Sequence, residues 1–329
     1  MALHLIYIDK ANQQTDITKL SSNYSRSDNV DALGMDFKFN LVNSPYDVQM
    51  QAKLDLGGKV AFYNENSLVF FGVLTDMSKS GLYQESWTAY DYAFYLNKSE
   101  AFIQFNDIAA NEAIKQLCES QSIPVGAICE MPTKVSKIYD TQSIADIIKD
   151  IIKKYTDETG NKIRLEVREN KLYLEKYENL ILTATYKTAT NEPSFDATKY
   201  PGDFSASYSI SDMKNKILVI SSKEKHAQVE ATEQDEDNIK SFGLLQKIEK
   251  VQDKEKAKAS QIAKTKLKEL NRIKTTRKVK LFGDDAIRAG RSLVFNQPTI
   301  NLVGTFLIKN CTHTYSNNNH FMELDLDAL

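Results

Sequence analysis

The amino-acid sequence predicts a β-rich α+β protein in which two β regions flank a smaller α+β unit. Three observations support this prediction. Short runs of alternating apolar and polar residues, typical of half-buried strands, fill residues 1–98 and 201–329. The segment between them, 99–200, carries apolar residues at helical spacings. A long lysine-rich helical pattern is inserted in the second β region, at about 226–276.

Size and composition are those of an ordinary soluble protein. The chain has 329 residues, 26% charged and 42% hydrophobic, enough for two or three domains. A net charge of -2 argues against a general nucleic-acid or membrane binder. Cys118, Cys129 and Cys311 are too scattered for a disulfide framework, so we expect free thiols. With no signal-peptide pattern and no apolar run of roughly 20 residues, we expect synthesis in the cytoplasm.

The first 98 residues are expected to form a small barrel or sandwich. The predicted strands are 3–8, 35–41, 59–63, 68–75 and 82–90. Phe37, Phe39 and Leu41 share one face of the second strand. Asn64-Glu65-Asn66 has turn-forming residues and predicts a hairpin between the third and fourth.

The middle region predicts two helices and a hairpin. Asp107 is expected to cap the first helix, which ends before Pro124. Its buried stripe comprises Ala110, Ala113, Ile114, Leu117 and Cys118. Ser143 and Asp146 resemble a capping box for the second helix, which ends before Gly160. Its stripe comprises Ile144, Ile147, Ile148, Ile151, Ile152 and Tyr155. A hairpin of 162–167 and 171–176 follows, and 188–203, with two prolines, is the expected linker.

The last third alternates strands with the inserted helix. Strands are expected at 204–211, 215–221, 278–281, 292–295, 304–315 and 320–326. The acidic run 230–237 predicts an exposed loop. A helix is expected to begin near Asp253, and its apolar stripe must be buried against the middle domain or a neighbouring subunit. The expected interface residues here are Phe242, Leu244, Leu245, Ile262, Leu267 and Leu270.

No motif for catalysis, a cofactor or a metal stands out. His313 and His320 lie on the two arms of the final hairpin, but a metal pair would need further ligands, which favours two half-exposed strand histidines. The run 235–237 lacks the glycine and closing glutamate of a calcium loop. Cys118 is interpreted as buried filler, and Asp284-Asp285 as a turn. We therefore expect no catalytic residue, no cofactor and no bound metal.

The order of the segments adds information that no single segment has. FGLLQ, then KVQDKEKAKASQIAKTKLKELNR, then GDDAIRAG and a final hairpin resemble the XkdQ/YqbQ-type proteins of defective prophages and phage-tail-like bacteriocins. These are relatives of the late control D proteins, the baseplate hubs of contractile tails. The stretch YDYAFYL at 90–96 is similar to the one that closes the first domain in that family.

The resemblance implies a fold and a function. It implies two tail-tube-like β-barrels, 1–98 and 201–329, around an α+β domain, 99–200, on which the insertion 226–276 can pack. It implies a homotrimer that joins the sixfold tail tube to the threefold spike, with tube, spike and other baseplate proteins as partners. The resemblance also implies incorporation into the tail or virion-like particle.

Two other functions are left open by the residues. A tail-associated cell-wall hydrolase would need a catalytic acid pair, which the sequence does not identify. Because the sequence ends at Leu329, directly after its last predicted strand, we expect any lytic activity to lie on another protein. Nucleic-acid binding through the basic helix 254–280 would use lysines that neighbouring glutamates balance, without aromatic residues to stack on bases.

Overall fold

The N-terminal region is a set of antiparallel strands around an aromatic core. The computed structural model describes residues 2–187, 192–223, 226–251, 258–316 and 319–328. The strands are β1 (Leu3–Ile8), β2 (Gln14–Asp16), β3 (Ser21–Asn29), β4 (Met35–Val42), β5 (Lys59–Asn64), β6 (Ser67–Ser80) and β7 (Gln84–Tyr90). Two short 3-10 helices are η1 (Thr18–Leu20) and η2 (Val48–Met50). Phe37, Phe39 and Trp87 are buried, and Glu65 has the positive φ that the predicted β5–β6 turn requires.

The middle region is an α+β unit with its own core. Its elements are α1 (Ala93–Lys98), β8 (Glu100–Ala109), α2 (Ala110–Ser120), β9 (Val125–Ile128), β10 (Lys134–Ser143), α3 (Ile144–Thr159), β11 (Ile163–Arg168), β12 (Lys171–Lys176) and η3 (Tyr177–Asn179). The predicted stripes of α2 and α3 are buried, with Ile152 half-buried. Ser143 Oγ accepts a hydrogen bond from Asp146 N at 3.1 Å, and Gly160 ends α3 in a left-handed conformation.

The predicted cap at Asp107 is wrong. Asp107 lies inside β8, which pairs with β10, and Ala109 is the residue before α2. The main-chain N–H of Ala110 instead donates to the carbonyl of Thr133 at 2.9 Å. Backbone pairing with a neighbouring segment therefore satisfies a group that the sequence pattern assigned to a side-chain cap.

The C-terminal β region begins earlier than residue 201. Its elements are β13 (Ile181–Leu182), β14 (Thr185–Tyr186), β15 (Phe195–Asp196), η4 (Ala197–Lys199), β16 (Phe204–Ser209), β20 (Lys274–Phe282), β21 (Ser292–Gln297), η6 (Pro298–Ile300), β22 (Leu302–Ser316) and β23 (Asn319–Ala328). β13 pairs with β21, and Ala197 is fully buried in the core of this region. The described part of the predicted linker, 192–203, therefore packs as structure; the rest of it lies outside the described residues.

A separate small unit is inserted between β16 and β20. It comprises β17 (Lys216–Lys223), β18 (His226–Gln234), α4 (Glu236–Phe242), β19 (Gln246–Val251) and α5 (Ala259–Leu270). α5 packs on β17 and β18 through Ala259, Ile262 and Ala263. The predicted helix start at Asp253 lies outside the described residues. The expected acidic loop is wrong, because 230–234 belong to β18 and Asp235 caps α4.

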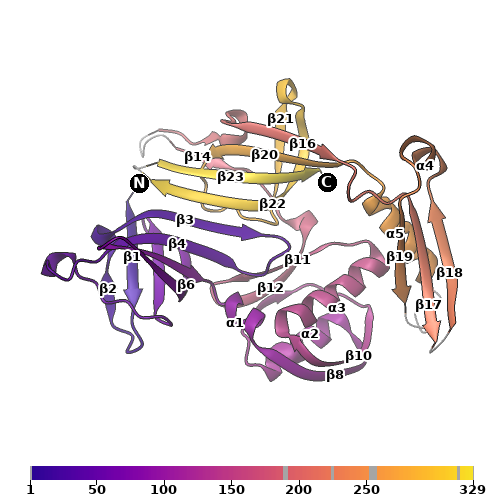
Figure 1. The fold of residues 1–329 in the computed structure, drawn as a ribbon, viewed down its shortest axis with the longest axis horizontal. Coiled ribbons are helices and arrows are strands. Elements are labelled where there is room, and N and C mark those ends of the chain that lie inside the picture. Colours follow the sequence, from indigo (N-terminus) through magenta and orange to yellow (C-terminus); the bar gives the residue numbers. More distant parts are fainter. Residues whose placement is uncertain (1, 188–191, 224–225, 252–257, 317–318, 329) are drawn as a thin grey trace.

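One large sheet joins the two β regions. Its main path runs β16-β20-β23-β22-β3-β4-β7-β6-β5-β1-β2. The junction is the antiparallel pair of β22 with β3, in which His313 lies opposite Arg26. In Figure 1 these N-terminal and C-terminal strands lie side by side, with α1–α3 on one side and the β17–β19 unit at the far end. Within the described residues, no helix is both long and apolar enough to cross a membrane.

Candidate functional site

Eight consecutive strands of the large sheet form a surface with two chemically different faces. From β16 to β6, each strand is antiparallel to the next. Because side chains alternate along a strand, residues in register across these strands lie in rows on one face or the other. Two such rows, followed strand by strand, define the two faces.

One face is polar across five of the eight strands, from β20 to β4. A row across five strands on this face consists of Lys280, Glu323, Thr312, Ser27 and Asp36. These side chains are exposed or half-buried. Two of them are hydrogen-bonded to each other: Ser27 Oγ lies 3.0 Å from Thr312 Oγ1. A hollow of 260 Å³ beside β16 is lined on the same face by residues that include Lys280, Thr312 and Glu323. This polar face is hydrated sheet surface of mixed charge.

The opposite face supplies the cores. The neighbouring row comprises Leu281, Met322, His313, Arg26, Phe37, Ala89 and Leu74. All seven are buried. Two separate clusters of buried side chains lie behind the sheet, one around the N-terminal strands and one around the C-terminal strands. The sheet therefore has one solvent-exposed face and one face that packs on two cores. Antiparallel sheets commonly have one face in solvent and the other on a core.

A buried polar network lies at the junction of the two cores. Arg26 donates to Asp285 Oδ1 at 3.0 Å and to the Asp285 carbonyl at 3.0 Å. Asn64 donates to the other carboxylate oxygen at 2.7 Å, and Tyr315 also donates to Asp285. Burial alone would raise the pKa of Asp285, but Arg26 and these donors hold it below its ordinary value. Residues from β3, β5 and β22 thus meet one turn of the C-terminal region.

The two predicted hairpin histidines belong to this network and are not half-exposed. His313 is 2% exposed and His320 is 5% exposed. His313 Nε2 donates to the carbonyl of Ile287 at 2.9 Å, so its Nδ1 accepts from His320 Nε2 at 2.8 Å. Burial lowers the pKa of His313 well below 6.5 and that of His320 to about 4. Both rings are neutral at pH 7, because an imidazolium here would be desolvated beside Arg26.

The same residues could be considered as metal ligands. One atom each from Asp285, His313 and His320 lie within 4.8 Å of one another. The histidine nitrogens are nevertheless hydrogen-bonded to each other, and the Arg26 guanidinium lies 3.0 Å from the carboxylate. A divalent cation would have to displace the shared proton beside a fixed positive charge. The arrangement therefore favours an internal hydrogen-bond network over a metal site.

The predicted interface residues divide into two groups. Phe242 and Leu244 are exposed and Leu245 is half-buried, at the end of α4 and just after it. Ile262, Leu267 and Leu270 pack inside the chain against β17 and β18. The second group is thus covered by this chain's own strands. Contact of Phe242 and Leu244 with another protein stays a prediction.

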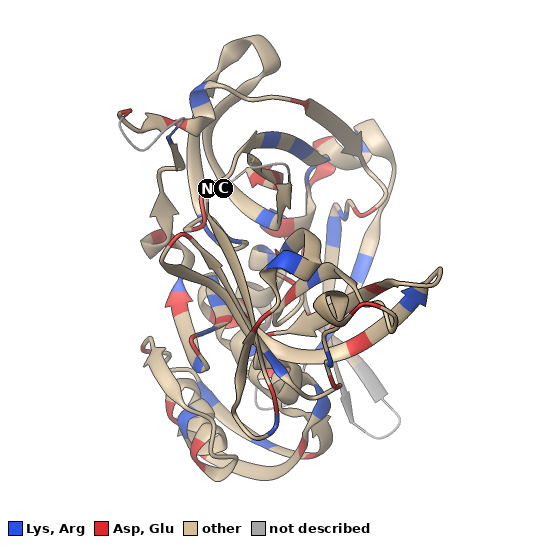
Figure 2. Cartoon of the chain, turned by 90° about the vertical axis from the view of Figure 1, so that its left-hand side faces the viewer, with Lys and Arg blue, Asp and Glu red and all other residues tan. Residues whose placement is uncertain are grey.

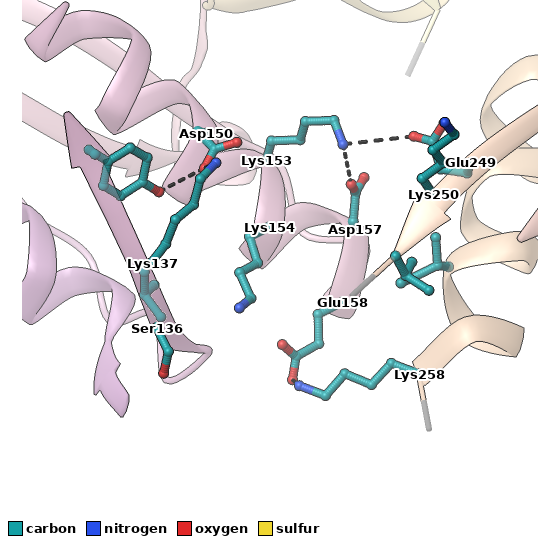
Figure 3. Close-up of a pocket in the computed structure, with 14 residues that line it drawn as sticks. Ser136, Lys137, Asp150, Lys153, Lys154, Asp157, Glu158, Glu249, Lys250 and Lys258 are labelled. Atoms are coloured by element: carbon teal, nitrogen blue, oxygen red, sulfur yellow. Dashed lines mark hydrogen bonds and ion pairs between the residues drawn. The ribbon is translucent and has the colours of Figure 1, made fainter. Parts of the chain in front are cut away.

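A charged groove separates the inserted unit from the middle region (Figure 3). Its volume is 430 Å³, and it lies between α3 and β10 on one side and β19 and α5 on the other. Lys153 lies 2.7 Å from Asp157 and 3.8 Å from Glu249. Glu158 pairs with Lys258 at 2.5 Å, and the fourth carboxylate of the lining also has a lysine partner. Each acid of the groove thus lies beside a lysine, so the groove is lined by ion pairs.

Sequence reasoning missed β3, which supplies Arg26, and the role of Asp285 in the network. β3 (SSNYSRSDN) was not predicted, because its buried positions are Tyr24, Arg26 and Asp28, which do not read as an apolar stripe. Asp285 was interpreted only as a turn residue. The signal that could have found them is the alternation itself, which persists in β3 when aromatic and charged residues occupy the buried positions.

Comparison with known proteins identifies the family. A family model described as YQBQ-like matches residues 25–327. The protein YqbQ of Bacillus subtilis (strain 168) is 24% identical over 282 residues, which are 82% of this chain and 81% of YqbQ. The phage-like element PBSX protein XkdQ of the same organism is 22% identical over 245 residues, which are 73% of this chain and 72% of XkdQ.

A solved structure shares the fold over nearly the whole chain. The 43 kDa tail protein of prophage MuSo2 from Shewanella oneidensis matches with a TM-score of 0.71 at 9% identity, covering 99% of this chain and 98% of that one. At this identity the match shows a shared β-rich fold. The family predicted from the order of the sequence segments is confirmed. This chain belongs to the YQBQ-like family.

Proposed function

We propose that this protein is a structural component of a contractile tail, the hub of its baseplate. Two observations about relatives support the proposal: XkdQ is named as a protein of a phage-like element, and the MuSo2 protein is named as a tail protein. In this proposal three copies form a ring between the sixfold tail tube and the threefold spike. Tube, spike and other baseplate proteins are its partners, and the particle is where it works.

The polar face of the large sheet is the observation that carries the proposal. In a ring with this face turned inward, rows such as Lys280–Glu323–Thr312 would line a water-filled bore. The two cores would lie outside it, and each would back one tube-like barrel. Two barrels in each of three copies give six units, which matches a sixfold tube. Closed cyclic symmetry also leaves no heterologous contact unsatisfied.

The chemistry of the chain supports a structural role. The four carboxylates in the groove are each beside a lysine, so that groove offers no free acid pair for hydrolysis. Charges of both signs are interspersed along the described part of the chain in Figure 2, whereas a nucleic-acid binder typically gathers basic residues on one face. In α5, Lys266 is held by Asp157 at 3.0 Å. We therefore propose packing and not catalysis or nucleic-acid binding as its role.

Imaging of the assembled protein tests the proposal. The chain would be co-expressed with tube and spike proteins of a contractile tail, purified, and examined by native mass spectrometry and negative-stain microscopy. We expect trimers and rings with a central bore. A chain that stays monomeric with these proteins, or one that clears peptidoglycan in a zymogram and loses this activity when a single carboxylate is changed, would overturn it.

A further inference from the structure

The inserted unit has one covered and one uncovered sheet face. Its strands pair in the order β18-β17-β19, separately from the large sheet, and the unit lies at the far end of the molecule in Figure 1. α5 packs on one face of this small sheet, against Ile217 and Val219 of the central strand. Because side chains alternate along a strand, Leu218 and Ile220 belong to the opposite face. This opposite side is the open face of the unit.

Aliphatic side chains adjoin on the open face. Ile248 of β19 pairs with Leu218, and Val229 of β18 pairs with Ile220. Val229 is 55% exposed and Ile248 is 52% exposed, while the two residues of the central strand are half-buried between them. An apolar patch that crosses all strands of the unit is therefore in contact with solvent.

The composition of β17 is that of a strand covered on both faces. Its residues 216–220, KILVI, include a continuous aliphatic run, whereas a strand with one face in solvent alternates apolar and polar residues. β17 also pairs in parallel with β19, and sheets of parallel strands occur almost only with helices on both faces. α5 supplies one of these covers. A second helix is the element that would complete the unit.

The charges beside the patch indicate the character of that helix. The register places Lys216 and Lys250 on the open face, and Lys250 also lines the groove between α3 and β19. Glu233 and Glu249 instead pair with residues of the face that α5 covers. Among the residues of the open face whose side chains are described, the charged ones are thus both lysines. Two such faces would repel each other, whereas a partner with carboxylates beside its apolar residues would be attracted.

We infer that the open face binds an amphipathic helix of another protein, one with aliphatic residues along one side and Asp or Glu beside them. The helix packs across the aliphatic patch as α5 packs on the opposite face, and its carboxylates meet Lys216 and Lys250. Phe242 and Leu244, which are exposed shortly before β19, lie next to this contact along the chain. The inference does not depend on the proposed ring, because the sheet of this unit is separate from the large one.

Two designed peptides test the inference with the full, isolated chain. Both are helical and carry leucines along one face; one has glutamates on the flanks of that face and the other has lysines there. Fluorescence anisotropy at low ionic strength would measure the dissociation constant of each peptide. We expect the glutamate peptide to bind roughly tenfold more tightly, because two lysines attract it and repel the other peptide.

Matched variants locate the binding. Val229→Glu and Ile248→Glu should each weaken binding of the glutamate peptide by roughly tenfold or more, because each places a charge in the apolar contact. Val294→Glu is the control: Val294 is also 55% exposed but lies on β21, so this variant should bind as the natural chain does. Lys216→Glu combined with Lys250→Glu should reverse the preference, so that the lysine peptide binds more tightly. Unchanged thermal melting of each variant separates a lost contact from a lost fold.

Several results would contradict the inference. They are equal affinity for the two peptides, no binding of either at about 1 mM, or full binding by Val229→Glu. Self-association of the chain alone that Val229→Glu abolishes would assign the open face to a second copy and would also overturn it. In the assembled tail, a photo-reactive benzoylphenylalanine in place of Ile248 should cross-link to an acidic helical segment of another protein. A particle without such a cross-link would refute this contact and leave the hub intact.

Discussion

Replacing His320 with Gln should change how stability depends on pH. Burial lowers the pKa of His320 from 6.5 to about 4, whereas the unfolded chain keeps the ordinary value. The folded pKa is the lower one, so the unfolded state binds more protons between pH 6.5 and 4. The contribution of neutral His320 is therefore complete above pH 6.5 and is lost as the pH falls through this window.

The size of this effect follows from the two pKa values. A difference of about 2.5 pH units, at about 1.4 kcal/mol each, makes the loss about 3 kcal/mol at pH 4. Asp91 acts in the opposite direction, because burial raises its pKa from 3.8 to about 6. Its folded form takes up a proton first, so lowering the pH relieves the cost of the buried carboxylate. The pH dependence of the free energy of unfolding contains the titrations of both His320 and Asp91. Because the natural chain and His320→Gln share Asp91, the difference between them isolates the contribution of His320.

The free energies of unfolding of the natural chain and of His320→Gln would be measured by urea unfolding at pH 7 and at pH 4, monitored by the fluorescence of Trp87. Trp87 is the only tryptophan and lies in the N-terminal core. We expect His320→Gln to be less stable than the natural chain at pH 7 and the gap to narrow by about 3 kcal/mol at pH 4. For Asp91→Asn, the stability of the natural chain relative to the variant should instead rise between pH 7 and pH 4. An equal gap for His320→Gln at both pH values would refute the assignment of a buried neutral histidine.

Three further substitutions test packing and pairing by thermal or urea unfolding. Gly283→Ala should cost about 1–3 kcal/mol, because its Cβ would lie 2.2 Å from the ring of His320; an unchanged melting temperature would show that this ring is elsewhere. Ile148→Asp should unfold the middle region, because it buries an unpaired charge at a cost of several kcal/mol, and normal melting would mean that the buried face of α3 is wrong. Arg291→Met removes one partner of the buried Arg291–Glu166 pair and should lower the free energy of unfolding by about 3 kcal/mol. This is the low end for a broken buried pair, because Glu166 keeps Arg168 as a neighbour. A loss below about 0.5 kcal/mol would mean that this pair behaves like an exposed one.

Local signals in the sequence predicted much of the fold. The stripe and cap of α3 could be predicted because a helix is decided by residues three and four apart. The β5–β6 and β11–β12 hairpins could also be predicted, because a tight turn depends on the few residues that form it. The strands of the inserted unit were only partly predicted. The acidic run of β18 was assigned to a loop, because its composition is that of an exposed loop and does not indicate its pairing with β17.

The network at the junction could not be predicted, for a reason of distance. His313 and His320 are near each other in the sequence, but the groups that bury and orient them come from far away. Arg26 is 259 residues from Asp285 along the chain. No spacing rule connects such residues, so a pair of histidines on a hairpin reads as surface. The polar face was missed for a related reason: a row across strands exists only once the strand order is known.

The junction of the two β regions illustrates what the buried polar groups contribute. A buried Arg26–Asp285 pair is weak evidence for stability, since apolar side chains of the same size often stabilise a protein as well. It does discriminate between registers. A one-residue slip of β3 against β22 would turn Arg26 onto the polar face and bring Ser25 into the core, which would leave Asp285 buried without its cation. We infer that the network selects one register between the two β regions. In a ring this register would set the rotation between neighbouring barrels, so a polar junction that tolerates no slip suits an assembly better than an apolar one that could slide.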